Sequence, residues 1–148
     1  MTDTNGNQFH HCFVCGPSNP QGLHLHFETY TLADGAIISI APVYLTRLHE
    51  GPTGYIHGGI IAALLDEAMG KLNIPLKVLA VTRNMEVDYL RPAPLETPLV
   101  VTGRHLRRKG RRLYQTAELT GPDGKTLARA KALFIVVDPS RFLRPAVY

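Results

Sequence analysis

The chain has 148 residues, 45% of them hydrophobic, and a formal net charge of +4. This length and apolar content exclude a disordered chain and suit a single domain over residues 1–148. No run of about 18 apolar residues is present, and the polar stretch 1–9 lacks the apolar core of a signal peptide. We therefore expect a cytoplasmic protein without membrane insertion. The mild positive charge fits a phosphorylated small molecule as well as nucleic acid.

Two cysteines, Cys12 and Cys15, lie in a turn-rich N-terminal segment, residues 1–23, directly after a pair of histidines. Thiolates and imidazoles at this spacing can share one zinc ion, but downstream only His24 and His26 are near enough to complete the ligand set. A redox pair is a second interpretation, although the surroundings do not resemble a βαβ unit. A structural turn is favoured over both, so we expect no metal.

Alternating apolar residues and turn signals then predict one helix and about six antiparallel strands, an α+β arrangement. In strand 77–90, strict alternation places Val81 and Met85 on one face and Thr82 and Asn84 on the other. The strands are expected at 23–30, 35–42, 77–90, 100–108, 111–120 and 125–137, the helix at 58–71, and a C-terminal tail at 138–148.

The helix 58–71 is apolar nearly all round, yet it carries two adjacent acids, Asp66 and Glu67. Glu67 precedes Lys71 by four residues, which predicts a helical ion pair on a solvated surface. Asp66 is rotated by about 100° from Glu67 and has no countercharge three or four residues away. A carboxylate in apolar surroundings is a candidate general base, and an acid satisfied by a donor across an interface is the equally weighted alternative.

The sequence His57-Gly58-Gly59 opens this helix. The first amides of a helix have no intrahelical partner, and glycines let a ligand oxygen approach them closely, as an acyl-transfer oxyanion requires. His57 either orients a substrate or only packs and hydrogen-bonds at the helix start. Asp66 follows Gly59 by about 10 Å along the axis. If the two act on one carbonyl they must come from different subunits, which predicts a symmetric dimer.

The stretch "HGGIIAALLDEAMG" resembles the motif of the hotdog-fold acyl-CoA thioesterases, PaaI-like branch. "VTRNMEVDYLRPAPLETPL" is similar to the strand and crossing that follow it in that family, and "CFVCGPSNPQGLHLHF" to the N-terminal segment of one subgroup. The resemblance covers residues 12–137. It implies a curved antiparallel sheet of about six strands wrapped around one long central helix. It also implies a homodimer, or a dimer of dimers, with active sites at the subunit interface.

The resemblance further implies hydrolysis of an acyl-CoA thioester, with coenzyme A as part of the substrate and no other cofactor. Asp66 would activate or orient the attacking water, or attack directly, and Thr82 would help to hold that water. The amide of Gly58 would polarise the thioester carbonyl, while His57 and Gly59 would shape the turn.

One position departs from the family pattern. Many relatives carry Asn or Gln six residues before the histidine, where this chain has Gly51 after His49 and Glu50. Either His49 replaces the missing amide donor, or Glu50 is protonated and donates, or the reaction is slower.

Arginines of "RHLRRKGRR" and of the strand bearing Thr82 are candidates for the phosphates of coenzyme A. They are Arg83, Arg108, Arg111 and Arg112; a solvated hairpin is the alternative. A nucleic-acid binder is disfavoured because Tyr114 is the only aromatic residue near this cluster and no reading motif is present. A hotdog dehydratase is less similar, and a non-catalytic acyl-CoA-binding module is the main alternative to a hydrolase. The acyl group is not predicted.

Overall fold

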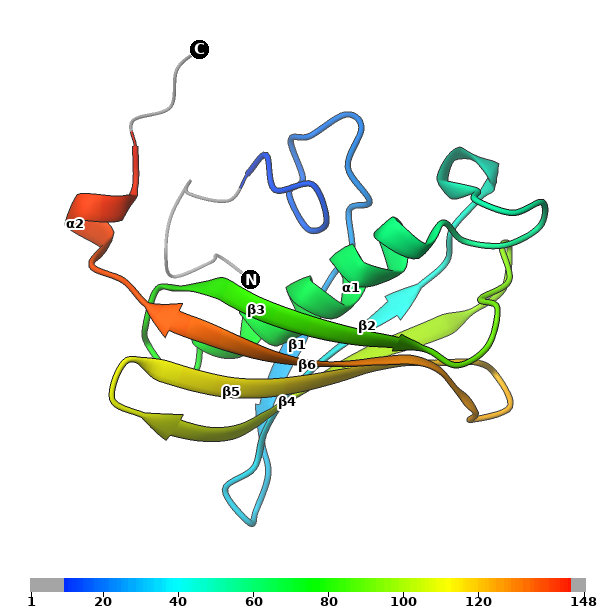
Figure 1. The fold of residues 1–148 in the computed structure, drawn as a ribbon. Coiled ribbons are helices and arrows are strands. Elements are labelled where there is room, and N and C mark those ends of the chain that lie inside the picture. Colours follow the sequence, from blue (N-terminus) through cyan, green and yellow to red (C-terminus); the bar gives the residue numbers. More distant parts are fainter. Residues whose placement is uncertain (1–9, 145–148) are drawn as a thin grey trace.

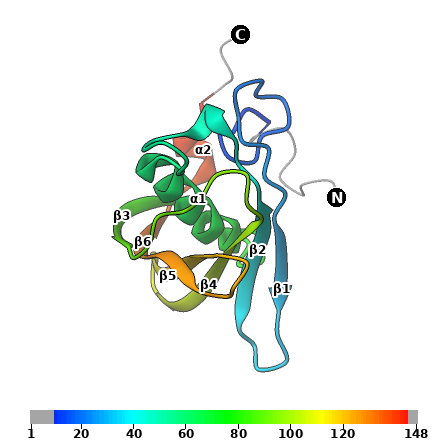
Figure 2. The ribbon, with the colours of Figure 1, turned by 90° about the vertical axis from the view of Figure 1, so that its right-hand side faces the viewer.

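A computed structural model describes residues 10–144. Six strands form one antiparallel sheet in the spatial order β1-β2-β4-β5-β6-β3. One long helix, α1, lies inside the curve of this sheet (Figures 1 and 2). The predicted α+β hotdog fold is confirmed. The elements are β1 (Glu28–Thr31), β2 (Ile37–Val43), η2 (Arg47–His49), α1 (Gly58–Gly70), η3 (Lys71–Asn73), β3 (Ala80–Tyr89), β4 (Leu99–Lys109), β5 (Arg112–Thr120), β6 (Thr126–Val136) and α2 (Pro139–Phe142).

Helix α1 fills the curve of the sheet with residues that recur every three or four positions. These are Ile61, Leu64, Leu65, Ala68 and Met69, all buried. They pack against inward-facing side chains of the sheet, which alternate with outward-facing ones along the regular parts of the strands. The helix backbone itself reaches the sheet, because the Ser39 hydroxyl donates to the Ala68 carbonyl at 2.5 Å.

Strand β1 is shorter than predicted. Its expected first half does not pair with β2, because the amides of Leu23 and Leu25 bond instead to the carbonyls of Phe13 and Val14. The N-terminal segment is thereby folded back over α1 (Figure 1). At the other end, α2 occupies part of the predicted tail. Residues 1–9 and 145–148 of the two predicted terminal segments lie outside the described residues.

Strand β3 contains an irregularity that the alternation pattern missed. The register against β6 shifts between Thr82 and Asn84, so that Thr82 is level with Phe134 and Asn84 with Leu133. One extra residue in a strand moves the following side chains to the opposite face. Thr82 therefore lies on the inner face with Met85, and the prediction that these two side chains lie on opposite faces was wrong.

No helix among residues 10–144 is both long and apolar enough to cross a membrane.

Candidate active site

Asp66 and Thr82 meet on the inner face of the sheet, where the middle of α1 faces the start of β3. The Thr82 hydroxyl donates to Asp66 Oδ1 at 2.6 Å. The Asp66 side chain is half-buried and lines a pocket of about 390 Å³. Most of the other walls of this pocket are apolar, including Ile74, Val78 and Phe134. The structure thus places one oriented carboxylate at the border of an apolar pocket.

The first turn of α1 leaves a single amide without a partner. His57 is the N-cap, and its Nδ1 accepts from the amide of Gly59 at 2.9 Å. The amides of Ile60 and Ile61 both donate to the His57 carbonyl. Among the described residues the Gly58 amide alone of this turn has no acceptor, and the helix dipole adds partial positive charge there. Of the two glycine amides predicted to meet an oxyanion, only that of Gly58 is available.

The N-cap bond of His57 predicts a stability effect. Because His57→Ala removes the acceptor for the Gly59 amide, we expect the free energy of unfolding to fall by about 1 kcal/mol. His57→Asn is the matched control, since its Oδ1 can accept the same bond. Urea unfolding followed by circular dichroism measures both variants, and equal stability of the Ala and Asn forms would contradict a capping role.

Tyr89 supports the same turn, and the sequence analysis did not single it out. Its hydroxyl donates to the Gly58 carbonyl at 2.9 Å. A Cβ added at Gly58 would lie 3.5 Å from the Tyr89 ring, an ordinary van der Waals distance. Packing does not require a glycine at this position. We infer that Gly58 instead leaves room for a ligand atom to approach its amide.

The loop before α1 has Gly51 at the position where the family pattern has an Asn or Gln side chain. A Cβ at Gly51 would lie 2.8 Å from the Cα of His57, so a longer residue does not fit there. Glu50 accepts a hydrogen bond from the Gly54 amide at 2.8 Å and lies 3.9 Å from the Arg47 guanidinium. Its carboxylate therefore serves as an acceptor within the loop. His49 accepts the Thr46 amide on Nδ1 at 3.2 Å, so in the neutral ring Nε2 carries the proton.

The four predicted arginines differ in what holds their side chains. Arg108 and Arg111 are held by backbone carbonyls, of Gly110 at 2.9 Å and of Val136 at 3.0 Å. Arg112 is level with Ile135, one residue from the β6 partner of Thr82, so the β4–β5 turn lies at the Asp66 end of the sheet. Arg83 lies at the β3 irregularity and is exposed.

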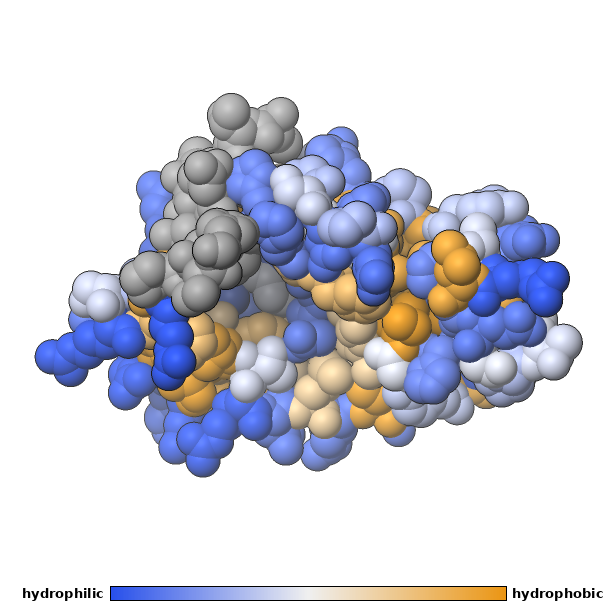
Figure 3. Space-filling model, turned by 90° about the horizontal axis from the view of Figure 1, so that it is seen from above, coloured by the Kyte–Doolittle hydropathy of each residue, from blue (hydrophilic) through white to orange (hydrophobic). Residues whose placement is uncertain are grey.

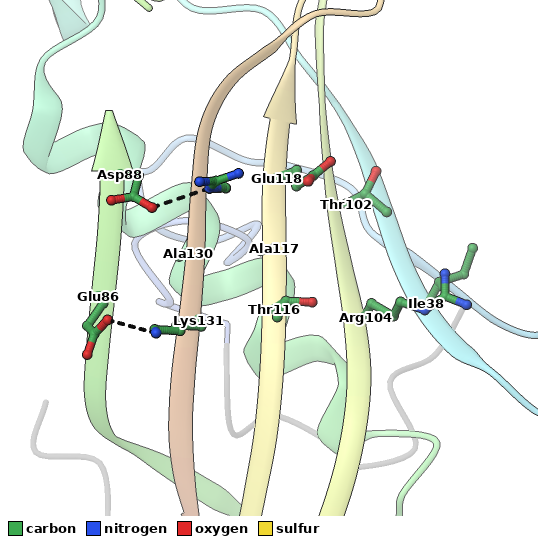
Figure 4. Close-up of a pocket in the computed structure, with 11 residues that line it drawn as sticks. Ile38, Glu86, Asp88, Thr102, Arg104, Thr116, Ala117, Glu118, Ala130 and Lys131 are labelled. Carbon is green, nitrogen blue, oxygen red and sulfur yellow. Dashed lines mark hydrogen bonds and ion pairs between the residues drawn. The ribbon is translucent and has the colours of Figure 1, made fainter. Parts of the chain in front are cut away.

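A larger hollow than this pocket lies elsewhere on the sheet. It measures about 790 Å³ and lies on the face of the sheet that turns away from α1 (Figure 4). Its walls carry the ion pairs Glu86–Lys131 at 3.2 Å and Asp88–Arg129 at 3.3 Å. These charges neutralise each other across neighbouring strands, and Asp66 is not among the lining residues. We therefore assign the candidate site to the smaller pocket.

A second cluster borders that pocket at the C-terminal half of α1. Glu67 lies 3.8 Å from Lys71, as predicted, but its side chain is only 20% exposed, so the predicted solvated surface was wrong. The N-terminal segment covers it, and the Cys12 thiol lies 3.6 Å from Glu67 Oε2. A hydrogen bond from Cys15 lowers the pKa of the Cys12 thiol to about 5, and burial raises the pKa of Glu67.

The model of the thioesterase superfamily matches residues 53–128, just over half of the chain, including Asp66, Thr82 and the His57 turn. The chain belongs to the thioesterase superfamily. A solved thioesterase superfamily protein superposes with a TM-score of 0.76 at 32% identity, covering 85% of this chain and 60% of that one. A Bacillus halodurans protein crystallised with CoA superposes with a TM-score of 0.63 at 25% identity, covering 75% of this chain and 74% of its own.

This member of the thioesterase superfamily is also similar to curated proteins. Acyl-coenzyme A thioesterase THEM4 of Rattus norvegicus is 33% identical over 119 residues, which are 79% of this chain and 51% of the relative. The Mus musculus protein of the same name is 37% identical over 93 residues, 62% of this chain and 40% of the relative. The chain spans about half the length of the curated relatives that it matches.

Proposed function

We propose that this protein hydrolyses acyl-CoA thioesters to a free acid and coenzyme A. The observation that carries the proposal is the pairing of an oriented carboxylate, Asp66, with a helix-start amide, Gly58, that has no acceptor among the described residues. The names of the curated relatives and the CoA bound to the Bacillus halodurans protein support the substrate class.

In the proposed reaction, Asp66 accepts a proton from a water molecule, which attacks the thioester carbonyl. The Thr82 hydroxyl keeps the carboxylate oriented. The carbonyl oxygen gains negative charge and is stabilised by the Gly58 amide at the positive end of the helix dipole. His49 Nε2–H is our candidate for the second donor, because the other nitrogen of that ring is already occupied by the Thr46 amide. The tetrahedral species then expels the CoA thiolate.

We propose that each site is shared by two subunits. Gly58 and Asp66 lie eight residues apart on one helix, about 12 Å along its axis, so one carbonyl does not contact both in a single chain. Strand β3 is an edge of the sheet, and it carries Thr82 near one end and Tyr89 at the other. Antiparallel pairing of two β3 edges about a two-fold axis brings the α1 start of one subunit toward Asp66 of the other.

Exposed apolar side chains near the start of α1 support this interface. Leu48 is 91% exposed, and Tyr55, Tyr89 and Leu90 are exposed as well. The view from the α1 side shows apolar surface between polar regions (Figure 3). Such side chains are typical of a surface covered by a partner. We therefore propose a homodimer, and two such dimers could assemble into a tetramer. The cytoplasmic location stays a prediction from the sequence.

For the substrate, we propose that the apolar pocket beside Asp66 holds the acyl group. The nucleotide phosphates of CoA would meet basic side chains at the same end of the sheet. All four predicted arginines are exposed, and we favour Arg83 and Arg112 because Arg108 and Arg111 donate to backbone carbonyls.

The direct test is release of free thiol from a panel of aliphatic and aromatic acyl-CoAs. We expect turnover of at least one member by the wild-type protein. Tight binding of acyl-CoA measured by calorimetry, without any turnover, would reject the proposed hydrolase activity and favour a non-catalytic acyl-CoA-binding module.

Gly58→Ala tests the role of the helix-start amide. The added methyl group fits beside Tyr89, so we expect unchanged or slightly higher stability, while kcat/KM falls by about 10²-fold because the methyl group obstructs the carbonyl. Gly121→Ala, in the β5–β6 turn, is the control and should keep full activity. Retention of wild-type kcat/KM by Gly58→Ala would remove this amide from the proposed mechanism.

Mixing variants tests the shared site. Asp66→Asn and Gly58→Ala chains, unfolded together and refolded at equal concentration, form half of their dimers as heterodimers, each with one intact site. We therefore expect activity to recover to about a quarter of the wild-type value. No recovery in a mixture shown to contain heterodimers would place both groups in one subunit.

A further inference from the structure

Three potential metal ligands from distant parts of the sequence converge at the C-terminal half of α1. The sulfurs of Cys12 and Cys15 and a carboxylate oxygen of Glu67 all lie within 4.8 Å of one another. Both thiols are half-buried and free, not joined in a disulfide. The sequence suggested the two cysteines with nearby histidines such as His24 and His26, but no histidine of residues 10–144 joins this group. The fold instead supplies the third ligand from 55 residues along the chain.

The turn that carries the cysteines is shaped to hold a thiolate. The Cys15 amide points at Cys12 Sγ from 3.5 Å, and the Gly16 amide donates to the Cys12 carbonyl at 2.8 Å. A Cβ at Gly16 would lie 2.4 Å from the Cys12 nitrogen, so the turn closes this tightly only with glycine. Backbone amides directed at sulfur stabilise its negative charge, which is the form that binds metals.

The distances match a tetrahedral ion. With bonds of about 2.3 Å to sulfur and about 2.0 Å to oxygen, neighbouring sulfur and oxygen ligands of zinc are separated by about 3.5 Å. Cys12 Sγ and Glu67 Oε2 are 3.6 Å apart. The remaining pairs, at up to 4.8 Å, need a contraction of about 1 Å, which rotation about the side-chain bonds supplies.

The carboxylate of Glu67 is oriented for binding through one oxygen. Lys71 Nζ lies 3.8 Å from Oε1, while Oε2 faces Cys12. The ammonium group therefore contacts the oxygen that turns away from the thiols. Groups that hold the outer atom of a metal ligand fix its orientation and strengthen binding.

We propose that Cys12, Cys15 and Glu67 bind one Zn²⁺ ion, with water as the fourth ligand. No fourth Cys, His, Asp or Glu within residues 10–144 joins the group. The ion links the N-terminal segment to α1 and thereby fixes the wall that Cys12 contributes to the pocket beside Asp66. Thiolate ligands favour zinc over magnesium or calcium.

The test uses the purified chain of residues 1–148, reduced and freed of metal, and titrated with Co²⁺ and then Zn²⁺. We expect about one equivalent of Co²⁺ per chain, with the charge-transfer absorption of cobalt–thiolate bonds and the visible bands of tetrahedral cobalt, both displaced by Zn²⁺. Cys15→Ser should lose the charge-transfer intensity of one thiolate. Glu67→Gln should weaken binding by at least about tenfold. Glu86→Gln, an exposed glutamate on β3, is the matched control and should bind as wild type.

The wild-type titration decides the proposal even if a cysteine variant fails to fold. Absence of tetrahedral cobalt bands in the reduced wild-type protein overturns it, as does a Cys12–Cys15 disulfide that persists under reducing conditions. Unchanged affinity of a folded Glu67→Gln variant also overturns it. Hydrolysis is not a readout in any arm, so these results do not depend on the proposed enzymatic function.

Discussion

Replacement of Asp66 by Asn is expected to lower kcat for acyl-CoA hydrolysis by about 10²- to 10⁴-fold, the range for loss of a positioned general base. The amide has nearly the shape of the carboxylate, and its oxygen can still accept the Thr82 hydroxyl now 2.6 Å away. The fold should therefore persist. Free-thiol release under steady-state conditions gives kcat, and circular dichroism with thermal unfolding verifies the structure.

Two comparisons separate chemistry from structure at Asp66. Asp88→Asn removes an exposed carboxylate from the outer face and should leave kcat unchanged. Thr82→Val removes the hydroxyl that orients Asp66 and should lower kcat by about tenfold, while Thr82→Ser restores most of it. Full activity of the Asp66→Asn variant would exclude this carboxylate from the proposed reaction.

The helix and its start were predictable because their signals are local. Apolar residues at helical spacing identify α1, and the His57-Gly58-Gly59 turn marks its start. The capping of Gly59 by His57 was not predictable. The sequence allows the histidine either to orient a substrate or to form a hydrogen bond at the helix start, and it does not distinguish the two roles. That detail matters, since it leaves Gly58 as the available amide.

Features that depend on contacts between distant segments were missed or only partly found. The β3 irregularity changes the face of Thr82 without any glycine or proline to announce it. Resemblance to a family motif, rather than periodicity, pointed to the contact between Thr82 and Asp66. Glu67 seemed solvated because its helical partner, Lys71, is local, whereas the Cys12 turn that covers it lies 55 residues earlier.

The position of Gly103 inside a predicted strand is itself a sequence signal. A glycine in the interior of a strand often marks the close approach of another backbone. Gly103 lies in the middle of β4, where the backbone of α1 contacts the sheet. A Cβ there would lie 2.3 Å from the Ala68 carbonyl oxygen and 2.6 Å from Ser39 Oγ. The same carbonyl accepts the buried hydroxyl of Ser39, so helix and sheet are held together where no side chain separates them.

Gly103→Ala is therefore expected to reduce the free energy of unfolding by about 3 kcal/mol or more. The obstructing atoms belong to a helix backbone and to a fully buried serine, so relief requires α1 to move away from β4. Displacement of α1 would also shift Asp66 relative to Thr82, and the protein that remains folded should lose the proposed activity. Urea unfolding monitored by circular dichroism gives the stability, and thiol release gives the activity.

Gly70→Ala, at the end of the same helix, is the matched control for stability. Its added Cβ would lie 3.9 Å from the Phe134 ring, an ordinary contact. Since alanine favours helix over glycine, this variant should gain about 0.5–1 kcal/mol. Opposite signs for the same chemical change would show that the close approach at Gly103, and not the loss of a glycine as such, determines the result. Equal stability of the two variants would mean that α1 does not contact β4 as closely as described.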